Sequence, residues 1–281
     1  MTKDPIVLNI PHARWEGISE YDDQYIVPEW VTIYETMIQT DWYTDKLFAI
    51  DNVHKVTAKV NRILVDTERF LADESEPMAL TGRGCLYTHG SRGQRIRRRL
   101  TEEERNKLLD LYYHPHHKAL DVAVQASLDC HNGCLLIDCH SFPDQPFPVE
   151  KDEAKRPDIC LGTTNSNTPR ELVQLLVEKL THWGYNVAIN TPYSGCVLPE
   201  AFQGDKRVLA VMIEVNRKLY LDQRVPEYSQ DAVKEKNLPI MNSHSSQLHE
   251  RLVDLIRLCM NEFVKSSTES LGMPDSHPQN Q

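Results

Sequence analysis

The sequence predicts a single α/β domain in which helices cover both faces of a mixed, mostly parallel sheet. Three apolar runs that are typical of buried strands lead to His12, His140 and Glu214. Helix signals separate these runs along the chain, and such alternation favours a parallel or mixed sheet. In open α/β sheets, ligands bind beyond the carboxyl ends of the strands. We therefore expect the three residues to meet at one site.

The first half of the chain begins with an apolar strand at residues 6–10, followed by a loop rich in Tyr, Asp and Pro. A helix is expected to open at Thr40, which is a suitable cap, and to extend to about residue 48. A second strand is expected at 60–66. Thr101 and Glu104 form a capping-box pattern ahead of a helix that runs towards Tyr113, and a further helix is expected from about His117 to a point before Gly133.

The second half continues the alternation from a strand that starts at Leu135. Thr168, Pro169 and Glu171 form a strong helix start, and Gly184 suits the left-handed residue that ends a helix. The remaining elements expected are a short strand at 158–162, a strand at 185–190, an amphipathic helix at 244–263, and a polar tail at 266–281 that we expect to be disordered. One domain is thus predicted over residues 1–265.

Composition limits the class of protein. The chain has 281 residues, of which 40% are hydrophobic, so it can bury a substantial core. It contains neither a long apolar stretch nor a basic and apolar amino terminus, which predicts a cytoplasmic protein with no membrane partner. Seven cysteines in a chain of this length are expected to be reduced thiols.

The net charge of -10 disfavours a nucleic-acid partner, because such proteins present a basic surface to phosphates. One basic run, at residues 92–99, is followed at once by three glutamates at 102–104. We interpret the run as a solvated loop whose charge these acids balance, and a role in attracting an anionic substrate stays open.

Two other kinds of site are disfavoured. Cys130, His131, Cys134, Cys139 and His140 lie close in sequence, but they contain no Cys-x-x-Cys pair, and the strand carries Cys139 away from Cys134. Serine-hydrolase chemistry is also poorly supported, because the chain has no Gly-x-Ser-x-Gly motif.

A metal site is favoured instead. His12 and His140 are candidate ligands, and Asp138, two residues before His140, would share its face of the strand and could orient the imidazole. Asp41 and Asp45 are four residues apart at a helix start, where they either complement the helix dipole or supply one ligand.

Substrate contacts are predicted from the arginines. Arg62, Arg69 and Arg217 lie near expected strand ends, and the planar guanidinium binds a carboxylate through two parallel hydrogen bonds. An anionic small substrate is therefore expected. Asn190 and Tyr193 are weaker candidates for polar contacts, because residues 190–195 are first of all typical of a turn.

Several spaced motifs occur in the order found in one known family. The chain resembles N-formylglutamate amidohydrolases over roughly residues 6–222. The motifs that carry the resemblance are Ile-Pro-His12, Thr-Asp-Trp-Tyr-Thr-Asp45, Asp66-x-Glu-Arg-Phe70, Glu-Pro-Met78, Tyr-Tyr-His-Pro-His-His117, Asp-Cys-His-Ser-Phe-Pro143, Arg-Pro-Asp-Ile-Cys160 and Ile-Glu-Val-Asn-Arg217.

The resemblance implies a fold similar to that of zinc carboxypeptidases, aspartoacylases and the wider phosphorylase/hydrolase-like group. It also implies one zinc or other divalent ion, held by His12, Asp45 and His140, with Glu214 as general base and Arg69 gripping a substrate carboxylate. Glu16 is the alternative second ligand. The Asp-x-Asn-Arg pattern of aspartoacylases appears here as Asp66-Thr-Glu-Arg69, so contacts beside Arg69 are expected to differ.

The activity that the resemblance implies is hydrolysis of the N-acyl bond of a small anionic N-acyl amino acid such as N-formylglutamate, within histidine degradation. Two alternatives stay open. The first is a related zinc amidase or carboxypeptidase acting on another N-acyl amino acid or a cell-wall peptide, and the second is a non-catalytic protein that binds a metal or ligand. The sequence gives no indication of the oligomeric state.

Overall fold

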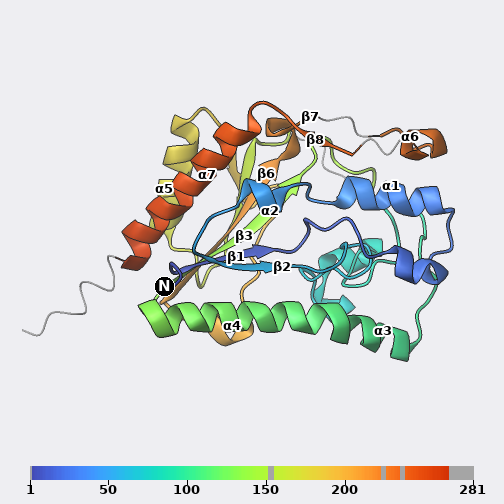
Figure 1. Cartoon of the computed structure of the whole chain (residues 1–281), viewed down its shortest axis with the longest axis horizontal. Helices are drawn as coiled ribbons and strands as arrows, with labels where there is room; N and C mark the ends of the chain where they lie inside the picture. Colours follow the sequence, from blue (N-terminus) through green and yellow to red (C-terminus); the bar gives the residue numbers. More distant parts are fainter. Residues whose placement is uncertain (1, 151–154, 223–225, 235–237, 266–281) are drawn as a thin grey trace, which may run out of the picture.

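A six-stranded sheet of order β2-β1-β3-β6-β4-β5 forms the centre of the protein (Figure 1). The computed structural model describes residues 2–150, 155–222, 226–234 and 238–265. Neighbouring strands run parallel except β4 and β6, which pair antiparallel. The strands are β1 (Ile6–Ile10), β2 (His54–Thr57), β3 (Cys134–Phe142), β4 (Ile159–Gly162), β5 (Val187–Ile189) and β6 (Val208–Asn216), with a separate pair β7 (Leu221–Asp222) and β8 (Ile240–Met241).

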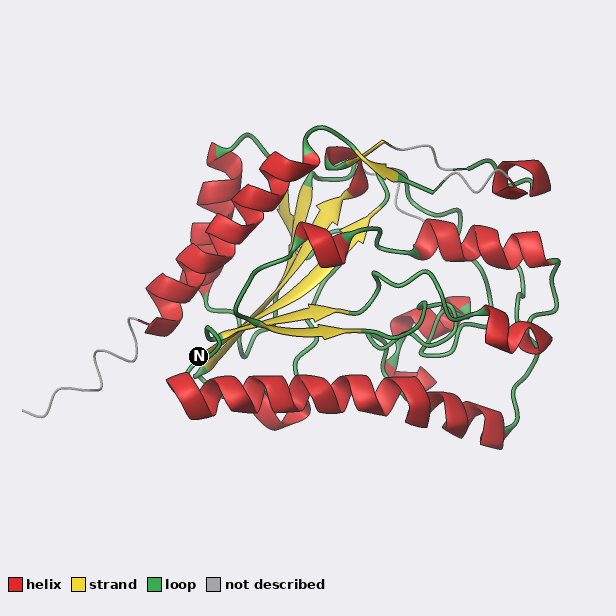
Figure 2. Cartoon of the chain, in the orientation of Figure 1, coloured by secondary structure: helices red, strands yellow, loops and turns green. Residues whose placement is uncertain are grey.

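Helices cover both faces of this sheet, as predicted (Figure 2). On one face α4 (His114–His131) packs its buried residues against Leu136 of β3 and Val7 of β1. On the other face α5 (Arg170–His182) and α7 (Ser245–Cys259) pack against Leu135 and Ile137. Alternate residues of β3 thus enter separate hydrophobic clusters, as the pleat of a strand requires.

The remaining helices are α1 (Glu29–Gln39), α2 (Thr44–Leu47), α3 (Glu102–Leu108) and α6 (Gln230–Lys234). Between α3 and α4 lies one π-helical segment, Leu109–Tyr113, so the helices predicted here form one nearly continuous rod along the edge of Figure 1. A second π-helical segment, Met260–Lys265, extends α7. Short 3-10 helices occupy Ser19–Gln24, Asp73–Ser75, Pro77–Thr81, Glu200–Phe202 and Arg217–Leu219.

Helix ends agree with the predicted signals in some places and not in others. The capping box is confirmed: Thr101 Oγ1 accepts the Glu104 N–H at 3.2 Å, and Glu104 Oε2 accepts the Thr101 N–H at 2.8 Å. Gly184 follows α5 with φ of 90°, as expected. Thr168 does not cap α5, however, because its hydroxyl donates to the Ala210 carbonyl at 2.6 Å and so ties the helix to β6.

The strand predicted at 60–66 is wrong. Residues there form turns, and β2 at His54–Thr57 is the strand that pairs with β1. The apolar side chains of the segment are buried in a cluster with Tyr87 and Tyr113, not in the sheet. Asn61 provides hydrogen-bond partners for backbone groups of these turns, since its Oδ1 accepts the Ile63 N–H and its Nδ2 donates to Arg14 O. Burial alone therefore produced a strand-like pattern.

The loop expected after β1 contains a helix, α1, that the sequence analysis missed. Pro28 precedes it and fixes its start. Thr40, predicted to open a helix, instead closes α1 by donating from Oγ1 to Thr36 O at 2.7 Å, and α2 begins only at Thr44.

Other predictions concern the chain as a whole. All seven cysteines are free. Among the described residues, no helix has the length and apolar character needed to cross a membrane. The tail predicted to be disordered, residues 266–281, lies outside the described part of the chain.

Candidate active site

Three strand ends converge on the same side of the sheet. His12 follows β1 by two residues, and His140 of β3 is paired in register with Glu214 of β6. Asp138 and His140 share the β3 face that carries Leu136 further back along the strand. All four polar side chains are buried. The predicted meeting of His12, His140 and Glu214 near one sheet edge is therefore observed.

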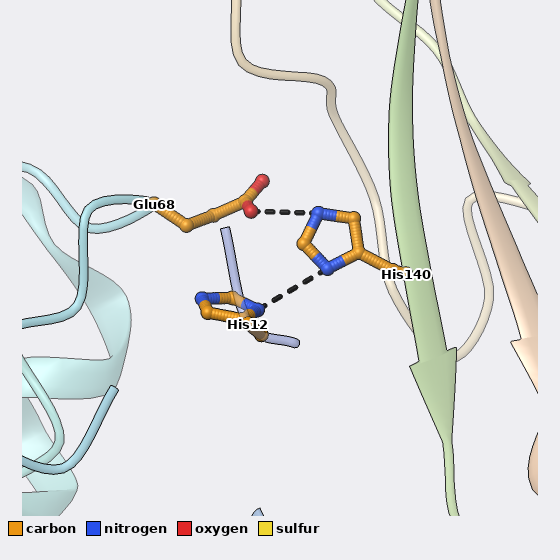
Figure 3. A group of neighbouring side chains, drawn as sticks. All are labelled: His12, Glu68 and His140. Atoms are coloured by element: carbon orange, nitrogen blue, oxygen red, sulfur yellow. Dashed lines mark hydrogen bonds and ion pairs between the residues drawn. The ribbon is translucent and has the colours of Figure 1, made fainter. Parts of the chain in front are cut away.

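The two histidines face each other through their Nδ1 atoms, which lie 3.2 Å apart (Figure 3). Their outer Nε2 atoms are held by carboxylates. His12 Nε2 lies 2.7 Å from Asp66 Oδ1, and His140 Nε2 lies 3.0 Å from Asp138 Oδ1. A carboxylate on the outer nitrogen orients an imidazole and makes it a better metal ligand.

Glu68 completes a group that could hold a metal ion. Ligand atoms of His12, Glu68 and His140 all lie within 4.8 Å of one another, and Glu68 Oε2 is 2.7 Å from His140 Nε2 (Figure 3). Glu68 comes from the loop after β2, so neither strand periodicity nor helix spacing indicates its approach.

Asp41 supplies a second carboxylate, between the facing Nδ1 atoms. Its Oδ2 lies 3.2 Å from His140 Nδ1 and 3.6 Å from His12 Nδ1. The Asp41 N–H also donates to His12 O at 2.9 Å, which fixes the residue beside the end of β1. Two imidazole nitrogens and a carboxylate oxygen at such separations form a suitable donor set for a divalent ion.

Charge around this group also favours a cation. Burial would lower the pKa of His140, but Glu68 and Asp138 raise it well above its ordinary value. Burial would raise the pKa of Asp41, but hydrogen bonds from His12 and His140 and the charge of Arg217 hold it well below its usual range. A buried cluster of carboxylates needs positive charge, which either protonated histidine or a bound metal supplies.

The second ligand predicted by resemblance is not brought to the site. Asp45 lies on α2 and is exposed, and the alternative, Glu16, is exposed and lies 3.7 Å from Arg14. Asp41, which the sequence leaves as an alternative to Asp45, points inward because α1 ends at Gln39 and the chain then turns back onto His12. Asp41 and Glu68 therefore replace Asp45 as the carboxylates beside the histidines.

Glu214 has the surroundings expected of a general base. Its side chain is 7% exposed, and Oε2 is buried with no hydrogen-bond partner among the described residues. Burial raises the pKa of Glu214 to about 8, with further contributions from Asp41 and Glu68 and an opposing one from His140. A carboxylate with a raised pKa accepts a proton more readily than an ordinary one.

These residues line a cavity of about 490 Å³ together with several arginines. Nε and Nη2 of Arg62 both donate to Asp66 Oδ2, at 3.0 and 2.9 Å. Arg69 lies beside them, with its Nε 3.8 Å from Asp66 Oδ2 and, among the described residues, without a hydrogen-bond partner. Arg69 is thus available to a substrate carboxylate.

Arg217 lines the cavity but is bound to the protein. It donates to Asp41 Oδ1 at 2.9 Å, to Ile38 O at 2.6 Å and to Ser141 Oγ at 3.2 Å. These contacts assign Arg217 to holding Asp41 in place, which differs from the predicted grip on substrate.

Of the two weaker candidates for substrate contacts, Tyr193 lines the cavity and Asn190 does not. Asn190 is exposed, adopts φ of 54°, and accepts the Thr163 and Gly195 N–H groups, so it forms the turn and lies outside the cavity lining. Tyr193 lines the cavity, and its hydroxyl lies 3.1 Å from Arg156 Nη1.

The basic run at 92–99 does not reach this cavity. Arg98 pairs with Glu104 at 2.6 Å, which confirms the predicted balance of charge. Arg97 differs, because it is fully buried and donates to Leu64 O at 3.1 Å. It thereby holds the turns that lead to Asp66.

Taken together, fold and site define a class: an α/β protein whose strand-end cavity combines a potential metal site with a buried carboxylate able to accept a proton, as hydrolases require. Comparison with known proteins is more specific. The chain matches the family model for N-formylglutamate amidohydrolase over residues 4–221. It therefore belongs to this family of amidohydrolases, as the motifs predicted, and membership supports a hydrolase.

Solved structures agree in fold. The N-formylglutamate amidohydrolase from Ralstonia eutropha JMP134 has a TM-score of 0.75 at 22% identity, over 95% of this chain and 96% of that chain. The gene product Atu2144 from Agrobacterium tumefaciens has a TM-score of 0.59 at 16% identity, over 92% of each chain. Among curated proteins, none matches this chain. The predicted α/β class is confirmed, and the relation to carboxypeptidases stays a prediction.

Proposed function

We propose that this protein is a metal-dependent hydrolase that cleaves the N-formyl amide bond of an acidic amino acid such as N-formylglutamate, releasing formate and the free amino acid. One observation carries the proposal. A single cavity holds two facing histidines with buried carboxylates, the unpartnered oxygen of Glu214, and the free guanidinium edge of Arg69. A cytoplasmic location and a role in histidine degradation stay predictions.

The residues present fit a divalent ion such as zinc. His12 Nδ1, His140 Nδ1 and Asp41 Oδ2 would hold it, because their outer contacts are already made and only their inner atoms face one another. Glu68 lies at the outer Nε2 of His140, so it would be a ligand of an ion held on that side of the ring. When bound, such an ion polarises the scissile carbonyl and lowers the pKa of a water to about 7.

Glu214 is the group that moves the proton. Its Oε2 accepts a proton from the attacking water as the new carbon–oxygen bond forms. When the carbon–nitrogen bond breaks, the same oxygen returns that proton to the departing nitrogen, so that formic acid and a neutral amino group result. The remaining acidic proton then passes from formic acid to the amino group, which gives formate and an ammonium group. Such general acid–base help typically contributes about 10²–10⁴-fold.

Arg69 is the residue that fixes the substrate. A planar guanidinium with an unused Nε–H can bind a carboxylate through two parallel hydrogen bonds. Arg62 keeps Asp66 charged and in place, and it adds positive charge to the same wall. The amide bond would then lie between Arg69 and Glu214.

The test is formate release from N-formylglutamate by purified protein, combined with elemental analysis of its metal. We expect about one divalent ion per chain and formate release that a chelator abolishes and added metal restores. Metal-loaded protein that releases no formate from any N-formyl amino acid would overturn the proposal.

A further inference from the structure

We infer that Arg83 binds the second, side-chain carboxylate of the substrate and thereby selects N-acyl derivatives of acidic amino acids. This inference rests on the proposed function and names the residue that sets its substrate class. No sequence motif pointed to Arg83, which lies between Gly82 and Gly84 ahead of a buried turn.

Arg83 lines the same cavity as Arg69. Glu76, which also lines it, contacts Arg69 and binds the backbone segment that leads to Arg83. Glu76 Oε1 lies 4.0 Å from Arg69 Nε and accepts the Met78 N–H at 2.9 Å, and the Arg83 N–H donates to Met78 O at 3.0 Å. The cavity therefore offers two guanidinium groups that a dicarboxylate could meet.

The Arg83 guanidinium is buried but only weakly engaged. Its side chain is 4% exposed. Its Nε donates a long bond of 3.4 Å to Thr81 Oγ1, and its Nη1 lies 3.8 Å from Glu150 Oε1. In the described part of the chain no shorter polar contact engages it. A buried cation with unfilled donors is costly unless an anion completes it.

Glu150 does not cancel this charge, because it is shared. Glu150 Oε2 lies 2.5 Å from Arg156 Nη2. Arg83, Arg156 and Glu150 together carry one net positive charge, which matches one carboxylate. Arg156 is less suited to bind it, since its Nη1 already donates to Pro143 O and Tyr193 Oη, both at 3.1 Å.

The test compares N-formyl-L-glutamate with N-formyl-L-glutamine, which has nearly the same shape but no side-chain charge. In Arg83→Gln, kcat/KM for N-formylglutamate should fall at least about tenfold, mainly through KM, because a hydrogen bond to a charged group is lost. N-formylglutamine hydrolysis, metal content and melting temperature should stay at wild-type values. Arg83→Lys should restore part of the preference for N-formylglutamate over N-formylglutamine. Arg92→Gln, outside the cavity, should leave kcat/KM for both substrates unchanged.

For Arg83→Gln, an equal loss for both substrates, which shows a structural role, or no loss for either would overturn the inference. Wild-type protein that hydrolyses both substrates equally would also overturn it while leaving the proposed function intact. Should wild type hydrolyse neither, the proposed function fails, and calorimetric binding of N-formylglutamate decides the role of Arg83. Equal affinity of wild type and Arg83→Gln then refutes it, and an affinity reduced at least about tenfold supports it.

Discussion

The β3 face that carries His140 changes character halfway along the strand. Cys134 and Leu136 are apolar and covered by α4, whereas His140 on the same face lines the cavity and is held there by the buried Asp138, whose Oδ1 lies 3.0 Å from His140 Nε2. The neighbouring strand repeats the change, from Val208 and Ala210 to Glu214. Helix α4 therefore buries one half of the face, and loops from other parts of the chain cover the other half. One half of this surface therefore contributes to stability, and the other half carries the groups proposed for chemistry.

The largest effect is expected from substitution of the carboxylates beside the histidines, in the half of the face that carries His140 and Glu214 (the cavity half). We expect Asp41→Asn to reduce bound metal well below one ion per chain and to abolish formate release, because a ligand is lost. Elemental analysis and a formate assay measure both effects. Glu68→Gln tests the alternative carboxylate, and exposed Asp45→Asn is the matched control that should behave as wild type. Metal loss in Asp45→Asn alone would show that Asp45 on α2 is the metal ligand.

Glu214→Gln should separate chemistry from binding within the cavity half. The amide is nearly isosteric, so metal content and melting temperature should be retained, while kcat falls by at least about 10²-fold. Single-turnover kinetics with N-formylglutamate measure this loss. Release of the metal would make Glu214 a ligand, and a wild-type kcat would remove it from the reaction.

Leu136→Ala should affect the apolar half alone. Leu136 is fully buried beneath α4, so its truncation should lower the free energy of unfolding by about 2–5 kcal/mol. Urea denaturation measures the change, and Val122→Ala on the exposed side of α4 should stay within about 0.5 kcal/mol of wild type. Metal content and kcat of the folded Leu136→Ala protein should be unchanged, and loss of either would show that the two halves are coupled.

Arg69→Lys, at another residue that lines the cavity, should give the smallest effect. Lysine keeps the charge and loses the two-pronged geometry, so we expect kcat/KM for substrates with an α-carboxylate to fall about tenfold, with metal intact. The same assay on a substrate whose α-carboxylate is amidated should show no difference between Arg69→Lys and wild type. Unchanged kcat/KM on both substrates would place Arg69 away from substrate.

Prediction from sequence succeeded where a strand fixes the direction of a side chain. The positions of His12, His140 and Glu214 follow from continuous apolar runs that end at these residues and from the rule that ligands bind beyond the carboxyl ends of the strands, and the spacing of two places Asp138 on the face of His140. Prediction failed where a turn determines the direction of the side chain. Glu68 reaches His140 from a segment whose buried apolar residues resembled a strand.

The choice between Asp41 and Asp45 shows the same limit. They are four residues apart, but Asp41 lies in the turn before α2, and only the end of α1, which the sequence did not predict, determines that Asp41 points inward. Two charges after the expected strand, in Asp66 and Glu68, were the available signal for the other carboxylates. Such signals indicate that a segment is functional, but they do not fix which atom approaches the histidines.

Binding of a metal through His12 and His140 is what distinguishes the polar half of this face from the apolar half in our proposal. Metal content of purified His140→Ala and His131→Ala is the measurement that tests this proposal, because His131 is a half-buried histidine at the end of α4 and does not line the cavity. We predict about one divalent ion per chain in wild type and His131→Ala, and a ratio well below one in His140→Ala. Equal, full metal occupancy in both variants would show that His140 is not a metal ligand.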